Sequence, residues 1–194
     1  MLVPAKITRT VTPILNGEFD VVSLSREHHK ADRLVSKANY IAVLPFDCLP
    51  DGKIKSIYGL KFDNHATGQK DVTLITDSFD QNRDKTAYDS VFRLFLEEAG
   101  VNLEDSGITE DDIFYLGNIT SSVPVSAKFK CFAIDLTKLA SLKQSPEFTR
   151  NLSKSSLEKD SSEIARLGFN QVVNGDFTDS MILSGSFLLV SYFS

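Results

Sequence analysis

The sequence predicts an α/β fold, because it combines strand-like stretches with helical ones. Apolar residues run almost without a break from 40 to 46 (YIAVLPF), which is typical of a buried strand. From 86 to 99 apolar residues recur at helical spacing, and Gly100 follows at a position where helices commonly end. With 194 residues, 42% of them hydrophobic, the chain can bury one sizeable core.

Residues 1–38 predict an N-terminal arm built on a β-hairpin. The pair Asn16-Gly17 lies between the apolar runs of 12–24, a spacing typical of a two-residue hairpin turn. Residues 26–38 are polar, and we expect a short helix or a connector there. The adjacent His28-His29 point in different directions on most backbones, so we interpret them as solvated rather than as metal ligands.

Residues 39–194 predict one domain that begins with the strand at 40–46. The turn Pro50-Asp51-Gly52 joins this strand to a second one at 53–62, because Pro presets φ and Gly accepts a positive φ. A third strand is expected at 72–76, and two further strands at 113–119 and 128–136.

The last third of the domain contains a loop-rich insertion at about 137–162, because this segment is rich in Ser and Lys and contains Pro146. A closing helix follows through 181–193. Asp176, Thr178 or Asp179 is expected to cap its N-terminus, since short oxygen-bearing side chains accept bonds from the first free N–H groups.

Composition excludes several classes of function. The net charge of −5 argues against binding to the phosphate backbone of a nucleic acid, which requires clustered Lys and Arg. The two cysteines, Cys48 and Cys131, lack the spacing of a zinc site, and we expect both to be buried thiols. Neither a signal peptide nor a membrane segment is recognisable, so we expect a protein of the cytoplasm or of an assembled particle.

The stretch RLFLEEAGV, residues 93–101, resembles the second half of the Nudix box, an Arg-Glu pair followed by an apolar residue, any residue, two Glu, any residue, Gly and an apolar residue. Eight of these nine positions fit. The order of strands and helices from Asn39 to the C-terminus is also similar to that family. The resemblance implies a Nudix-like α/β/α sandwich with a mixed sheet, preceded by the N-terminal hairpin arm.

The box departs from the family at positions that matter for catalysis. Glutamates at i, i+3 and i+4 share one helical face and hold divalent cations against a diphosphate. Here those positions are Leu94, Glu97 and Glu98, so the first glutamate is lost, and the Gly-Glu of the first half falls on Asp84-Lys85. We interpret Leu94 as an extension of the apolar surface formed with Val91.

Arg93, Glu97 and Glu98 are therefore vestigial catalytic candidates. Arg93 precedes Glu97 by four residues, and such a pair stabilises an exposed helix by only a few tenths of a kcal/mol. No cofactor is expected. If the chain is active, Glu97 and Glu98 would form one weak Mg²⁺ site. Asp89, Glu158 or Glu163, from elsewhere in the chain, would supply a further carboxylate.

Three functions follow from this resemblance. The first is a non-catalytic Nudix-fold protein acting as a binding or assembly subunit with protein partners, for example as a structural component of a viral or phage particle. The alternative is a Mg²⁺-dependent pyrophosphohydrolase of nucleoside diphosphate derivatives. The third is a sensor that binds a nucleotide without cleaving it.

Overall fold

The structure is a computed structural model. It describes residues 8–14, 19–26, 29–36, 38–64, 68–121, 126–139, 164–174 and 179–194.

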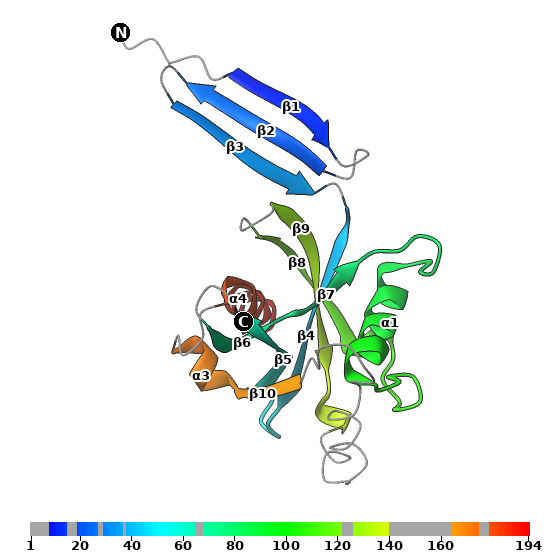
Figure 1. The fold of residues 1–194 in the computed structure, drawn as a ribbon. Coiled ribbons are helices and arrows are strands. Elements are labelled where there is room, and N and C mark those ends of the chain that lie inside the picture. The colour runs from blue at the N-terminus through cyan, green and yellow to red at the C-terminus, as the bar shows by residue number, and fades with distance from the viewer. Residues whose placement is uncertain are drawn as a thin grey trace.

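The N-terminal part forms a small sheet that extends away from the rest of the described chain (Figure 1). Its strands are β1 (Thr8–Ile14), β2 (Phe19–Arg26) and β3 (His29–Ser36), paired antiparallel in that order. The pairing of Ile14 with Phe19 confirms the predicted hairpin between β1 and β2. The turn residues, 15–18, lie outside the described residues.

The expectation of a short helix or connector at 26–38 was wrong, because β3 occupies most of this segment and makes the arm a three-stranded sheet. Every residue of β3 has a partner in β2, from His29 opposite Arg26 to Ser36 opposite Phe19. The sequence of β3 is mostly polar, and its conformation is set by pairing with β2 rather than by its own propensity, as is common for strands.

A seven-stranded mixed sheet forms the centre of the molecule. Its main order is β10-β5-β4-β9-β8. The strands β4 (Tyr40–Cys48) and β9 (Ala127–Asp135) are parallel, whereas the other neighbouring pairs are antiparallel. The predicted hairpin links β4 to β5 (Ile54–Asn64), with Gly52 at a φ of 81° in the turn. The strand predicted at 113–119 is confirmed as β8 (Ile113–Ser121).

The single strand predicted at 72–76 is two short strands. The first, β6 (Gln69–Thr73), pairs with β5, and the second, β7 (Ile75–Ser78), pairs with β4. The chain changes partner at Leu74, whose side chain is fully buried. This change of partner brings the end of β7 to the first strand of the domain, next to the helix that carries the box.

The sheet is covered by helices on both faces, so the predicted α/β/α sandwich is confirmed (Figure 1). The helix α1 (Ala87–Ala99) covers one face and α4 (Ser180–Phe193) covers the other. Alternate residues of β4 supply both cores: Ile41 and Val43 face α1, whereas Leu44 and Phe46 face α4. A short 3₁₀ turn, η2 (Glu110–Asp112), precedes β8.

The C-terminal third contains two elements that the sequence did not predict, β10 (Ile164–Gly168) and α3 (Phe169–Val173). The expected insertion at about 137–162 lies mostly outside the described residues, which include only its first three positions. Among the three predicted caps, Asp179 is the one used. Its side chain accepts from the backbone N–H groups of Met181 and Ile182 at 2.8 and 3.0 Å.

The two cysteines differ in their surroundings. Cys131 is fully buried, as predicted, and burial raises the pKa of its thiol to about 12. Cys48 is only half-buried, because it lies at the end of β4, so the expectation of two buried thiols holds for Cys131 alone. Within the described residues, every helix is too short or too polar to cross a membrane.

Gly59 of β5 lies where the backbone of β6 leaves no room for a side chain. A Cβ at this position would lie 2.5 Å from the carbonyl oxygen of Thr73 and 2.7 Å from Cγ1 of Val72. We expect Gly59→Ala to lower the free energy of unfolding by about 2 kcal/mol, as overpacking does. Urea denaturation measures this change.

Gly168→Ala is the matched control. Its Cβ would meet only the Gln171 side chain, at 3.1 Å from Oε1, which also accepts a hydrogen bond from the Gly168 N–H. Because a shift of this side chain weakens only one exposed helix cap, the expected change is less than about 1 kcal/mol. Equal effects of the two substitutions would contradict the close approach at Gly59.

Candidate functional site

The box residues lie on α1, which forms where the sequence predicts it. Thr86 caps the N-terminus: its Oγ1 accepts from the Asp89 backbone N–H, and the Asp89 side chain accepts from the Thr86 N–H at 2.7 Å. Gly100 ends the helix with a φ of 66°. The Asp89 carboxylate therefore caps the helix. To help bind a metal ion, as proposed above, it would have to give up this hydrogen bond.

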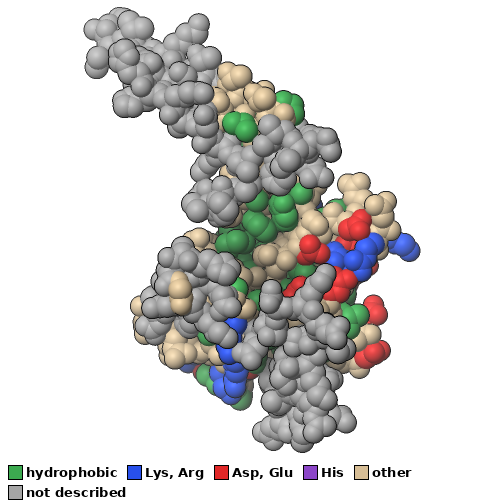
Figure 2. All heavy atoms as spheres, in the orientation of Figure 1, with side chains coloured by type: hydrophobic (Ala, Val, Ile, Leu, Met, Phe, Trp, Pro, Cys, Tyr) green, Lys and Arg blue, Asp and Glu red, His purple; other side chains and the backbone are tan. Residues whose placement is uncertain are grey.

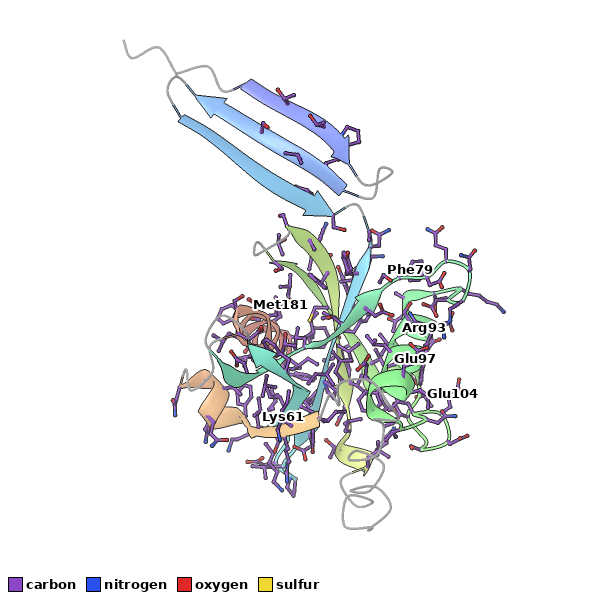
Figure 3. All side chains as sticks on the ribbon, in the orientation of Figure 1. Lys61, Phe79, Arg93, Glu97, Glu104 and Met181 are labelled. Carbon is purple, nitrogen blue, oxygen red and sulfur yellow. The ribbon has the colours of Figure 1, made fainter. Side chains whose placement is uncertain are left out.

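Leu94 lies on the buried face of α1 and is 1% exposed. It packs in the core between α1 and the sheet together with Val91, which confirms that this position extends the apolar surface. The side chain at the lost glutamate position thus faces the sheet. Arg93 and Glu97 project on another side of the helix, where they lie close together (Figure 3).

Arg93 is the centre of a cluster of carboxylates from three segments. Its Nη1 lies 3.0 Å from Oδ2 of Asp77 in β7 and 2.8 Å from Oε2 of Glu97. Its Nη2 and Nε lie 2.9 and 3.0 Å from the carboxylate of Asp84, in the loop before α1. The Arg93 side chain is only 12% exposed, and these carboxylates raise the pKa of its guanidinium above the usual value.

Asp84 is the most buried carboxylate of the cluster, at 2% exposure. It accepts a hydrogen bond from the Ser90 hydroxyl at 2.6 Å in addition to those from Arg93. The Arg93 guanidinium holds the pKa of Asp84 below its ordinary value. Sequence reasoning missed Asp77 and Asp84 as members of this cluster. The sequence pattern that could have predicted them is a pair of aspartates, one at each end of the loop that precedes an arginine-bearing helix.

The two glutamates retained from the box differ in their surroundings. Glu97 accepts from Arg93 and also from Arg83 of the preceding loop, so two guanidinium groups share its carboxylate. Glu98 is half-buried, and burial raises its pKa, with further contributions from the negative charges of Asp77 and Glu97. In Figure 2 the acidic and basic side chains of this region gather on the side of the molecule that carries α1.

These residues fit poorly to the Mg²⁺ ions that the resemblance implies. Mg²⁺ takes an octahedral set of oxygens, which requires carboxylates turned toward a common point. Within the described segments, no group of three or more His, Cys, Asp or Glu side chains converges in this way. The position of the first glutamate is apolar, and Glu97 is neutralised by arginines. Glu158 and Glu163 lie outside the described residues, as does His28.

Comparison with known proteins supports the Nudix fold. The sequence matches no protein-family model and no curated protein sequence. The structure is similar to the crystal structure of an ADP compounds hydrolase, with a TM-score of 0.55 and 15% identity over 97% of this chain and 94% of that one. It is also similar to the NUDIX domain of Shewanella oneidensis NrtR complexed with ADP ribose, with a TM-score of 0.54 and 11% identity over 82% and 90% of the two chains.

The Arg93–Asp84 pair should contribute strongly to stability. Asp84→Asn leaves a mostly buried guanidinium without its most buried charged partner, and we expect a loss of about 2 to 3 kcal/mol at pH 7. Asp77→Asn is the matched control, because Asp77 contacts the same arginine but is 44% exposed, and it should cost less than about 1 kcal/mol. Chemical denaturation of both variants measures the difference, and equal losses would refute the assigned role of Asp84.

The effect of Asp84→Asn should also depend on pH. The pKa of Asp84 is lowered in the folded state, so its stabilisation is fully present above the unfolded-state pKa of about 4 and is lost as pH falls through the folded value. The gap in unfolding free energy between wild type and Asp84→Asn should be constant from pH 5 to 7 and narrow below about pH 4. A gap that widens with acid would contradict this sign.

Proposed function

We propose that this chain, which has the Nudix fold, is a binding or assembly protein that does not hydrolyse a ligand by the metal-dependent route. The observation that carries the proposal is the state of the three box positions. Leu94 is buried in the core, the Glu97 carboxylate is shared by two arginines, and Glu98 is half-buried. A scaffold that loses its metal face keeps its shape, and fold alone does not fix function.

The energetics of the Arg93 cluster support this proposal. A divalent cation bound by Glu97 would have to displace Arg93 and Arg83, or lie beside their positive charges. Displacing Arg93 as a whole would also disturb its charge-assisted hydrogen bonds to the buried Asp84 carboxylate, which are individually worth about 1.5 to 3 kcal/mol. Lys85 adds another positive charge at the place where the family has an acid. The narrower expectation of a viral or phage component stays a prediction.

A second function, a Mg²⁺-dependent pyrophosphohydrolase of nucleoside diphosphate derivatives, is favoured by two other observations. One similar structure is named as a hydrolase of ADP compounds, and the similar regions cover almost the whole of both chains. Burial raises the pKa of Glu98, and the nearby negative charges of Asp77 and Glu97, the kind of group a cation would bridge, raise it further. In this proposal Glu97 and Glu98 bind the ion and Arg93 orients them. The similar structures support this function better than an assembly role.

Turnover of ADP-ribose and related nucleoside diphosphate derivatives with Mg²⁺ or Mn²⁺ separates these two functions. We expect no product above that of a protein-free control. Turnover that is lost in Glu98→Gln and retained in Glu104→Gln would overturn the non-catalytic proposal. Glu104 is a suitable control because it is an exposed glutamate after α1, away from the cluster (Figure 3).

Leu94→Glu is a poor way to restore activity, because it would place a carboxylate at a site that is 1% exposed and surrounded by apolar side chains. We expect it to destabilise the fold by several kcal/mol instead of creating a metal ligand, since burying an unpaired charge is costly. Glu98→Gln removes a carboxylate whose charged form burial already disfavours, so the variant should remain folded. Circular dichroism of each variant checks this point.

Nucleotide sensing, the third function, is supported by the NrtR domain, which is named as a complex with ADP ribose. A sensor would be stabilised by ligand without forming product, because a ligand that binds only the folded state raises the midpoint of thermal unfolding. Thermal unfolding with and without ADP-ribose, in the presence of chelator, measures this. Stabilisation without turnover would narrow the binding proposal to a nucleotide.

A further inference from the structure

The outer surface of α4 is apolar and carries no charge. From Ser180 to Ser194 the sequence has no Asp, Glu, Lys or Arg, although 24% of the whole chain is charged. Phe187 is 73% exposed at the middle of this surface, and Val190 of α4 and Val173 of α3 are 38% and 62% exposed. Side chains of this size usually lose their contact with water in the functional state when they occur together.

A groove of about 770 Å³ lies beside Phe187. Its walls come from β8, α3 and α4, and its lining contains no charged side chain. Asn118 and Thr120 of β8 provide the few polar groups on one wall, while Val173, Leu183 and Val190 provide apolar surface. The same face therefore has a projecting aromatic ring and a cavity next to it.

The serines of α4 do not make this face strongly polar. The hydroxyl groups of Ser184 and Ser191, which flank Phe187, donate to the backbone carbonyls of Ser180 and Phe187 at 2.7 and 2.9 Å. The Ser186 hydroxyl donates to the Ile182 carbonyl at 2.7 Å. Their hydrogen atoms are satisfied within the helix, so an apolar partner can cover them at a small cost.

We propose that this face, defined by Val173, Phe187, Val190 and the adjoining groove, binds a second copy of this chain about a two-fold axis. In such an interface each copy offers the same patch, so a projecting group and its receiving cavity must both belong to that patch. Phe187 and the groove meet this requirement. Phe187 of each copy enters the groove of the other.

Charge supports a second copy over other occupants. Two chains of net charge −5 repel each other, and the face that costs least on approach is one without acids. An anionic membrane surface attracts basic residues around the apolar side chains, and α4 has none. A strongly charged protein partner would find no counter-charge on the face. This proposal is independent of whether the α1 side hydrolyses a ligand.

Sedimentation equilibrium of the full chain at micromolar concentrations tests the proposal. We expect a dimer in the wild type and at least a tenfold weaker dimer in Phe187→Glu, because the substitution places two carboxylates in apolar grooves. Leu96→Glu is the matched control: Leu96 is an exposed apolar residue of α1, on the opposite face of the sheet, and this variant should dimerise like the wild type.

A monomeric wild type, or a dimer that Phe187→Glu leaves unchanged, would overturn the proposal. Phe187→Ala serves as a second variant if the glutamate affects folding, and it should also weaken the dimer. Sedimentation with uncharged phosphatidylcholine vesicles tests a lipid surface, and vesicle binding by a monomeric wild type would assign the face to a membrane instead.

Discussion

The pairing of β4 on both sides is the constraint on which the rest of the structure depends. Seven consecutive residues of β4, from Ile41 to Asp47, are buried, so the strand needs cover on both faces. The helices α1 and α4 supply that cover. The strand also pairs with β5, β7 and β9, which fixes the ends of all three. The pairing of strands inside the domain therefore determines where the polar side chains of these strands and their loops lie on the surface.

The Arg93 cluster is a direct consequence of this pairing. Tyr40 of β4 lies opposite Ser78 of β7, and the backbone N–H of Phe79 donates to the Asn39 carbonyl at 2.7 Å. These contacts hold Asp77 beside α1. The carboxylates of the site thus converge on a cation that belongs to the protein, the Arg93 guanidinium. In a metal-dependent enzyme they would instead converge on a metal ion taken from solution. The same charges stabilise the fold and oppose metal binding.

Local periodicity predicted the elements whose own residues determine them, such as β4 and the two long helices. It failed for β3, whose sequence is mostly polar, and for β10, which is short. Each becomes a strand through its partner, β2 in one case and β5 in the other. Asp84 was missed for a related reason. Its contact with Arg93 joins a loop to a helix, and the position of that loop depends on the pairing of β7 and on the backbone hydrogen bond from Asp84 to the Asp80 carbonyl.

The two sides of the sandwich have different chemistry. On the α1 side, charges from the helix, β7 and the connecting loop form ion pairs with one another. On the α4 side, the helix carries no charge and satisfies its serine hydroxyls internally. An ion-paired surface gains little from burial, because surface ion pairs are weak and charged groups are costly to desolvate. An uncharged apolar surface gains from it directly. The self-association proposed for α4 would therefore bury the uncharged side and leave the ion-paired α1 side open to solvent.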